Sequence, residues 1–185
     1  KKIIEKFKNY NFSTSHLQNI SPEVRYKELL RNKKIAIVGP ADYLENSNLG
    51  DEIDSYDLVV RINRGIELIE TYHKDIGRRT DILYSCLIEE PTNAGKIDPF
   101  KFSDEYKLKF ICTTPFEKNK LFFKYRDVHP LVDKKKFKNL SKIIPTRIIP
   151  LNFWKDFSKE LKTRPTTGYI SIFDILEFEP KKLKI

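Results

Sequence analysis

The chain has 185 residues, of which 39% are hydrophobic and 33% are charged, and its formal net charge is +9. This length predicts one domain that can bury a core, and no apolar run approaches the ~18 residues of a membrane-spanning helix. The excess of positive charge indicates an anionic partner, which would be a nucleic acid, an acidic membrane or a phosphorylated small molecule. A basic surface that is merely solvated is the alternative.

Short apolar runs alternate with helical patterns along the chain. A lysine-rich helix or arm is expected at residues 1–15, and a helix at 21–32 has Ser21 as its N-cap and Pro22 in its first turn. Further helices are expected within 48–57, at 66–77, 119–129 and 152–161, and after an opening loop in 164–180. Strands are expected at 34–38, 57–63, 80–88, 108–115, 146–151 and 181–185. This alternation predicts an α/β domain with a largely parallel sheet.

Composition also bears on processing, compartment and metal binding. The sequence contains no methionine, so we expect a processed or trimmed chain, and its N-terminus has no signal-peptide pattern. Cys86 and Cys112 lie in apolar stretches and are predicted to be buried free thiols in a reducing compartment. Because His16, His73 and His129 are scattered without the spacing of metal ligands, we expect no structural metal.

Two loops are candidates for a ligand site. In parallel α/β sheets, ligands bind beyond the carboxyl ends of the strands, where the strand order reverses. The loop after Val38 and the loop before Gly168 each open a helix beside a strand, so we expect them to share one cleft. A dinucleotide fingerprint is excluded because Pro40 and Ala41 follow Gly39 and because the second strand lacks a terminal acidic residue. The Gly-Lys-Ser/Thr of a P-loop and the G-x-S-x-G of a nucleophile elbow are absent as well.

A long pattern of spaced residues covers the first of these loops and the strand that follows it. The pattern consists of Gly39, Leu44, Ser47, Gly50, Ile53, Asp54, Ser55, Asp57, Val59, Arg61 and Asn63. It resembles the large motif of the animal-type sialyltransferase family. Downstream, "RPTTGYISIFDILEF" resembles the small motif of that family, in which Pro-Ser/Thr-Ser/Thr-Gly opens an apolar helix. The resemblance covers roughly residues 30–185.

The resemblance implies a function and a fold. Members of the family transfer sialic acid from CMP-sialic acid to a glycan hydroxyl, with inversion and without a metal, on a Rossmann-like glycosyltransferase fold. We therefore expect a single domain with a mostly parallel sheet flanked by helices. Residues 1–30 would form an N-terminal helical arm, and residues 31–185 a nucleotide-sugar-binding domain that is truncated at its C-terminal end. A CMP-Kdo-type transferase and a catalytically inactive nucleotide-sugar-binding domain are the alternatives.

Partners and location follow from the same resemblance. The expected partners are a CMP-sugar donor and a glycan or glycolipid acceptor, with no cofactor, no metal and no nucleic acid. The basic surface suggests peripheral membrane association of a cytoplasmic protein.

The candidate substrate-binding residues come from both motifs and from the strand between them. They are Gly39, Pro40, Ala41, Asn46, Ser47, Arg61, Asn63, Thr113, Thr114, Thr166, Thr167 and Gly168. Asn63 ends a strand, so its amide is expected to donate to the CMP phosphate or ribose. The helix start at Thr166–Gly168 is a natural anion site because its N–H groups are free.

Some candidates carry open alternatives. Arg61 is as well explained by a structural salt bridge as by a ligand contact, and Thr113 and Thr114 by core or turn positions as by contact with the acceptor. Asp54 and Asp57 are interpreted as capping and loop-fixing groups rather than as catalytic acids.

The chain departs from the family pattern in three places. The family has a nucleotide-binding Asn at the position of Pro40, so that contact is lost or is supplied by Asn46 or Ser47. The family's disulfide cysteines correspond to Ile35 and Glu179, which suggests a bacterial or viral relative in a reducing compartment. The catalytic residues are unknown, because the family's catalytic histidines follow the small motif and are expected beyond residue 185. His129 does not match a motif of the family.

Overall fold

A parallel sheet of six strands forms the centre of the described part of the chain, which comprises residues 21–40, 44–115 and 134–185 of a computed structural model. The strand order is β5-β4-β3-β2-β1-β6, and every neighbouring pair is parallel. The strands are β1 (Lys34–Val38), β2 (Leu58–Ile62), β3 (Ile82–Ser85), β4 (Phe110–Thr113), β5 (Thr146–Ile148) and β6 (Lys182–Lys184). The predicted α/β fold with a parallel sheet is therefore confirmed.

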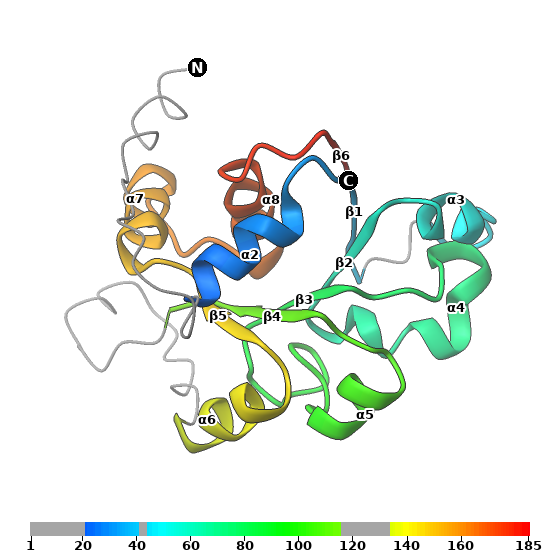
Figure 1. The fold of residues 1–185 in the computed structure, drawn as a ribbon, viewed down its shortest axis with the longest axis horizontal. Coiled ribbons are helices and arrows are strands. Elements are labelled where there is room, and N and C mark those ends of the chain that lie inside the picture. Colours follow the sequence, from blue (N-terminus) through cyan, green and yellow to red (C-terminus); the bar gives the residue numbers. More distant parts are fainter. Residues whose placement is uncertain (1–20, 41–43, 116–133) are drawn as a thin grey trace.

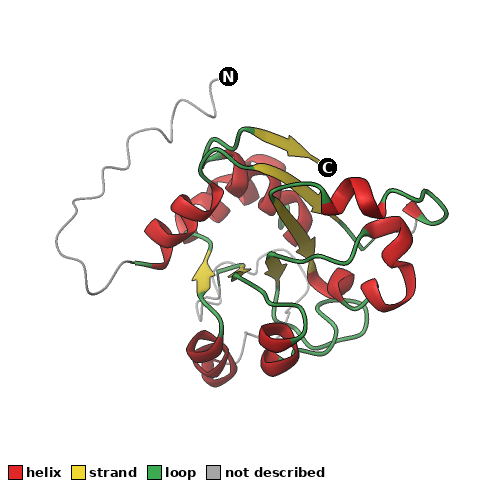
Figure 2. Ribbon diagram, turned by 45° about the vertical axis from the view of Figure 1, so that its right-hand side comes forward, coloured by secondary structure: helices red, strands yellow, loops and turns green. Residues whose placement is uncertain are grey.

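Helices cover both faces of the sheet, which gives three layers (Figures 1 and 2). One face carries α2 (Pro22–Leu30), α7 (Leu151–Leu161) and α8 (Thr167–Leu176). The other face carries α3 (Gly50–Asp54), α4 (Ile69–Ile76), α5 (Pro99–Asp104) and α6 (Lys134–Ile143). A short 3-10 helix, η2 (Asn63–Ile66), connects β2 to α4. The chain crosses one face from β1 to β5 and then returns over the opposite face to place β6 beside β1.

The strands are unbroken apolar runs because both of their faces are covered. Successive side chains of a strand point to opposite faces. Ile35 and Ile37 accordingly belong to the core under α2 and α8, whereas Ala36 and Val38 belong to the core under α3 and α4. The run was predicted as a doubly buried strand for this reason.

Several helix boundaries differ from those expected. The helix predicted at 66–77 begins only at Ile69, and its backbone is kinked at Tyr72. Helices α5 and α6 were not predicted, although the Asp98 side chain caps α5 through bonds from two backbone N–H groups, a signal that the sequence "DPF" contains. Helix α7 begins at Leu151, with Pro150 rather than Asn152 as its N-cap. The arm predicted at 1–15 and the helix predicted at 119–129 lie outside the described residues.

Helix α2 is part of the packed core. It lies within the segment 1–30 that the sequence predicts as an arm, yet Tyr26 and Leu30 are fully buried beneath it. The Ser21 side chain accepts a bond from the N–H of Val24 and Pro22 occupies the first turn, as predicted. The described α/β unit therefore includes this helix.

A buried ionic cluster joins α2, the sheet and α8. The Arg147 guanidinium of β5 donates to both carboxylate oxygens of Asp174 in α8, at 2.5 and 2.9 Å, and to both of Glu23 in α2, at 2.5 and 2.9 Å. The Tyr84 hydroxyl of β3 donates to Asp174 at 2.5 Å, and the Tyr26 hydroxyl lies 2.7 Å from that of Tyr84. Burial alone would lower the pKa of Arg147, but Asp174 and Glu23 raise it well above its usual value. The guanidinium is therefore charged in the core.

Glycine permits close contact between α3 and α4. A Cβ atom on Gly50 would lie 2.4 Å from the carbonyl oxygen of His73 and 2.6 Å from that of Lys74. These are backbone atoms of α4, so they cannot move aside without shifting the helix. For Gly39, by contrast, no atom of the described residues beyond its two chain neighbours lies within 4 Å of the position that its Cβ would take.

The first prediction concerns the ionic cluster. Replacing Arg147 by Met leaves the buried Asp174 carboxylate without its cation, so we expect the free energy of unfolding to fall by about 3–5 kcal/mol. Urea denaturation measures this change, with the exposed Arg31→Met as the control. The double variant Arg147→Met/Asp174→Asn should recover part of the loss. A loss no larger than that of the control would contradict a structural role for the pair.

The second prediction compares two glycines of the same motif. Gly50→Ala should lower the free energy of unfolding by about 1–3 kcal/mol, because the added methyl group overlaps backbone atoms of α4. Gly39→Ala should change it by about 0.5 kcal/mol or less, because the methyl group enters open space. Urea denaturation of both variants checks this, and equal effects would refute the proposed packing.

Candidate functional site

Candidate residues from both motifs gather at the carboxyl edge of the sheet. Gly39 follows β1, Asn63 follows β2, and Thr113 ends β4. Because all the strands are parallel, these positions lie at one edge of the sheet. The amino-terminal end of α8 reaches the same edge: a Cβ atom on Gly168 would lie 4.0 Å from the Cγ2 atom of Ile62, the last residue of β2. The two motifs are therefore neighbours at the end of β2.

Asn63 is held in an unusual conformation at this junction. Its φ of 50° is left-handed, a region that asparagine tolerates better than most residues. Its side-chain oxygen accepts a bond of 2.9 Å from the backbone N–H of Cys86, which follows β3. The amide nitrogen has no hydrogen-bond partner among the described residues. The half-buried side chain is thus fixed at one end and retains a free donor at the other.

The beginning of α8 is suited to an anion. The exposed Thr166 is its N-cap, and its hydroxyl accepts a bond of 3.1 Å from the N–H of Tyr169. Thr167 and Gly168 are half-buried, and the first turn contains no acidic residue. The free N–H groups of this turn and the helix dipole give it a partial positive charge. The predicted placement of this segment at a helix start is confirmed.

Two residues near the junction were not among the predicted site residues. Burial raises the pKa of the Cys86 thiol, while the positive charge of Arg164 acts against this rise. Arg164 is exposed and stands two residues before the cap of α8. A signal for Arg164 was present, because it opens the second motif, but nothing in the sequence indicated that Cys86 would bond to Asn63.

The two threonines at the end of β4 have different surroundings from those expected of a ligand-binding pair. Thr113 is fully buried and Thr114 is 8% exposed. The Thr113 hydroxyl donates to the Thr114 carbonyl at 3.4 Å. Thr113 pairs in register with Ser85 of β3 and Ile148 of β5. These surroundings agree with the core alternative for Thr113, and the contact of the two threonines with the acceptor stays a prediction.

The loop after β1 is attached to α4. The Ser47 hydroxyl donates to the carbonyl of Asp75 at 3.4 Å and accepts a bond from the N–H of Leu49, so Ser47 fixes the loop. Asn46 is exposed and adopts a φ of 63°. A cavity of about 260 Å³ lies beside this loop, and it is lined by Gly39, Pro40, Leu44, Glu45, Arg64, Leu68, Tyr72 and Ile76. Ala41 lies outside the described residues.

Arg61 has a structural role. It is completely buried, and its Nη2 donates to the carbonyls of Ile76 and Gly77 at 2.7 and 2.9 Å. Its Nε donates to the Thr80 hydroxyl at 2.9 Å. Burial lowers the pKa of Arg61 to about 10. This guanidinium binds the end of α4 and the turn that follows, which agrees with the structural alternative, while its contact with substrate stays a prediction.

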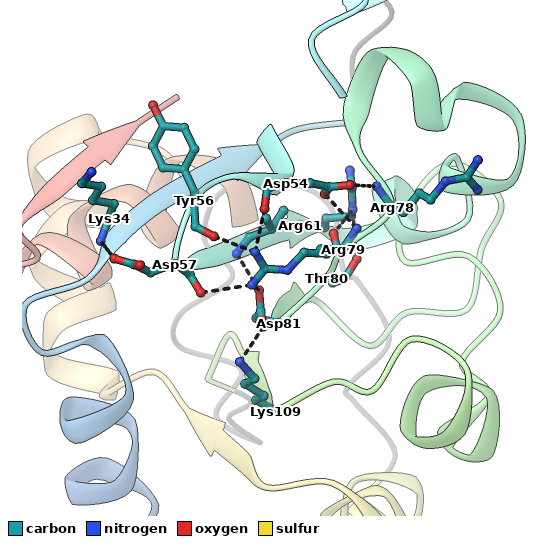
Figure 3. Close-up of polar contacts among 11 residues, drawn as sticks. Lys34, Asp54, Tyr56, Asp57, Arg61, Arg78, Arg79, Thr80, Asp81 and Lys109 are labelled. Atoms are coloured by element: carbon teal, nitrogen blue, oxygen red, sulfur yellow. Dashed lines mark hydrogen bonds and ion pairs between the residues drawn. The ribbon is translucent and has the colours of Figure 1, made fainter. Parts of the chain in front are cut away.

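The acidic residues of the first motif are loop-fixing groups, as predicted (Figure 3). Asp54 accepts bonds from the backbone N–H groups of Arg78 and Arg79 at 2.8 and 3.0 Å. The Arg79 side chain in turn donates to the carbonyls of Asp54 and Tyr56, both at 2.7 Å. Asp57 accepts from the N–H of Lys34 at 2.7 Å. These residues precede β1, β2 and β3, so they lie at the amino-terminal edge of the sheet, opposite the candidate site.

Cys86 and Cys112 are both free and buried, as predicted. His73 lies in the last turn of α4, away from the carboxyl edge, whereas His16 and His129 lie outside the described residues. Within the described ranges, no group of three or more His, Cys, Asp or Glu side chains could hold a metal ion, and no helix is long and apolar enough to cross a membrane.

The third prediction concerns the reactivity of the thiols. Burial raises the pKa of both, that of Cys112 to about 12, so the reactive thiolate is scarce in the folded chain near neutral pH. Iodoacetamide labelling, followed by mass spectrometry, should be slow and should accelerate as the pH rises toward these values. Cys86, which is 5% exposed, should react before Cys112, which is fully buried. Urea should abolish the difference, and rapid labelling of native Cys112 would contradict its burial.

Comparisons with known proteins agree with this geometry. The model of glycosyltransferase family 29 (sialyltransferase) matches residues 2–177. The human type 2 lactosamine alpha-2,3-sialyltransferase is 30% identical over 152 residues, which cover 76% of this chain and 45% of that protein. A chicken alpha-N-acetylgalactosaminide alpha-2,6-sialyltransferase 1 is 32% identical over 80 residues, which cover 39% of this chain and 14% of that protein. The chain thus spans less than half the length of these curated relatives.

Two solved structures share the fold. A mammalian sialyltransferase in complex with Gal-beta-1-3GalNAc-ortho-nitrophenol aligns with a TM-score of 0.59 at 21% identity, over 90% of this chain and 59% of that one. A second crystal structure of a mammalian sialyltransferase aligns with a TM-score of 0.55 at 17% identity, over 100% of this chain and 70% of that one. Since the family model covers almost the whole chain, this protein belongs to glycosyltransferase family 29, the sialyltransferase family.

Proposed function

We propose that this chain binds the CMP-activated sugar donor of a sialyltransferase-type glycosyltransferase, which transfers the sugar to a glycan hydroxyl. The proposal rests chiefly on one observation: the free amide of Asn63 and the amino-terminal turn of α8 meet at the end of β2. Family membership supports the reaction class. The names of two further relatives specify CMP-N-acetylneuraminate as their donor, so sialic acid is the sugar that we favour over Kdo.

Each group at the junction has a chemical task in this proposal. The Asn63 amide donates to the phosphate or ribose of CMP. The N–H groups of Thr167 and Gly168 bind the phosphate through the positive end of the helix dipole. Arg164, two residues before the Thr166 cap, adds a full positive charge to this segment. Together these groups favour a dianionic ligand at a helix start.

The same groups would assist the transfer itself. Negative charge develops on the phosphate as the bond from the sugar to CMP breaks. Donors fixed in advance around that phosphate stabilise the transition state without having to reorganise. The N-cap bond of Thr166 and the bond from Cys86 to Asn63 keep the donors in place before the ligand arrives. This charge stabilisation is compatible with a reaction that needs no metal, which we propose for this chain.

We also propose a reducing, cytoplasmic location. The two free buried thiols, Cys86 and Cys112, support this location. A second support is that Ile35 and Glu179 stand at the positions of the two cysteines that the family joins as a disulfide.

The fourth prediction tests the donor site with a substitution that preserves the local fold. Asn63→Asp keeps an oxygen for the N–H of Cys86 and tolerates the left-handed φ, but it replaces the free donor by a negative charge. We expect CMP binding to weaken by at least tenfold, in line with the about 1–3 kcal/mol lost when a buried polar partner is left unsatisfied. Isothermal titration calorimetry with CMP measures the affinity.

A matched control removes the general effect of charge. Asn32 is exposed, has a φ of 56° and precedes β1 at the opposite edge of the sheet, so Asn32→Asp makes the same change away from the site. Its CMP affinity should equal that of the unmodified chain. Thr167→Pro, at the first helical position where proline is tolerated, should weaken CMP binding because it removes one of the proposed N–H donors while the Thr166 cap remains. Absence of binding at millimolar CMP, or equal losses in Asn63→Asp and Asn32→Asp, would refute the proposal.

A further inference from the structure

A cluster of cations occupies the amino-terminal edge of the sheet, where β1 and β6 begin. Its members are Arg31, Lys33, Lys34, Lys181 and Lys182, all of them exposed, and we call this cluster the basic edge. Lys34 pairs in register with Lys182 across the two strands, and the N–H of Lys182 donates to the carbonyl of Lys33 at 3.4 Å. Segments that are far apart in the sequence thus bring five cations together.

The charges of the basic edge are only partly neutralised. None of its five side chains forms an ion pair with another described residue. Asp57 is the carboxylate beside them: the bond from the N–H of Lys34 lowers its pKa, and the charges of Lys33, Lys34 and Lys181 lower it further. Glu179 precedes Lys181 by two residues. The five cations thus exceed the two carboxylates, Asp57 and Glu179, of the segments that form the basic edge.

The chemistry of the basic edge indicates its partner. Lysine ammonium groups act as point charges and attract phosphate without a fixed geometry, as the head groups of a fluid bilayer require. Single-stranded nucleic acid also needs exposed aromatic rings on which its bases can stack. The aromatic ring at this edge, Tyr56, is 7% exposed and lies 5.5 Å below the ammonium group of Lys182. A lipid surface therefore fits better than a nucleic acid.

We propose that the basic edge docks the chain on an anionic phospholipid surface. The choice of a membrane also rests on the proposed function, because glycolipids are one class of acceptor. The candidate donor site lies at the other end of the same strands, roughly 15 Å away for strands of four or five residues. Docking therefore leaves the donor site open, and the chain binds lipid and CMP independently.

Vesicle co-sedimentation tests this docking. The chain should bind vesicles of phosphatidylcholine with phosphatidylserine, but not vesicles of phosphatidylcholine alone, and high ionic strength should release it. In Lys33→Gln/Lys181→Gln both substitutions are on exposed side chains, so the fold should be retained. Loss of two surface lysines should lower the partition coefficient roughly 30-fold.

A control with the same loss of charge isolates the basic edge. Lys96→Gln/Lys159→Gln removes two exposed lysines elsewhere, so its vesicle binding should remain within about threefold of that of the unmodified chain. Equal losses in the two double variants would overturn the proposal, as would vesicle binding that is insensitive to phosphatidylserine. Tighter binding to a single-stranded oligonucleotide, lost in Lys33→Gln/Lys181→Gln, would assign the edge to nucleic acid instead.

CMP titration separates this inference from the proposed function. Lys33→Gln/Lys181→Gln should bind CMP with unchanged affinity, with or without vesicles. A chain that binds acidic vesicles but not CMP would refute the donor site and leave the docking surface standing.

Discussion

The buried pair of Arg147 and Asp174 holds the second motif against the sheet. Asp174 lies in α8, so its two bonds to β5, together with the Tyr84 hydroxyl, fix the helix that presents Thr167 and Gly168 at the carboxyl edge. Glu23 extends the cluster to α2. A buried charge that loses its partner is costly, so this cluster stabilises the observed arrangement of the three elements. The position of the proposed phosphate-binding turn depends on it.

The first motif has two ends with different tasks. Asp54 and Asp57 at the amino-terminal edge, and Arg61 from within β2, bind backbone groups and fix the turns that lead into the strands. At the carboxyl edge, Asn63 follows β2 and carries a donor that no other described residue uses. A binding residue must be held in place by neighbours that do not themselves bind the ligand. Most of the motif therefore supports the few positions that face the donor site.

The two edges of the sheet also differ in charge. The basic edge joins residues that precede β1 and β6, whereas the donor site joins residues that follow β1 and β2 and precede α8. Since the strands are parallel, their beginnings and ends are separated by the full strand length. One sheet thereby carries two anion-attracting surfaces that do not compete. The basic edge suits a broad surface of lipid head groups, and the donor site suits a single phosphate.

The sequence by itself determined the α/β class, the six strands and the two motif segments, because apolar periodicity and capping residues act over a few neighbouring residues. It also placed Asn63 and Thr166–Gly168 at the ends of elements, where donors are free. Only the tertiary structure decided that Arg61 and Thr113 face the core, because an arginine or threonine in a strand can face either a cleft or a buried neighbour. It likewise decided the return of β6 to β1 and the contact of Arg147 with Glu23, 124 residues away, since long-range contacts leave no local pattern.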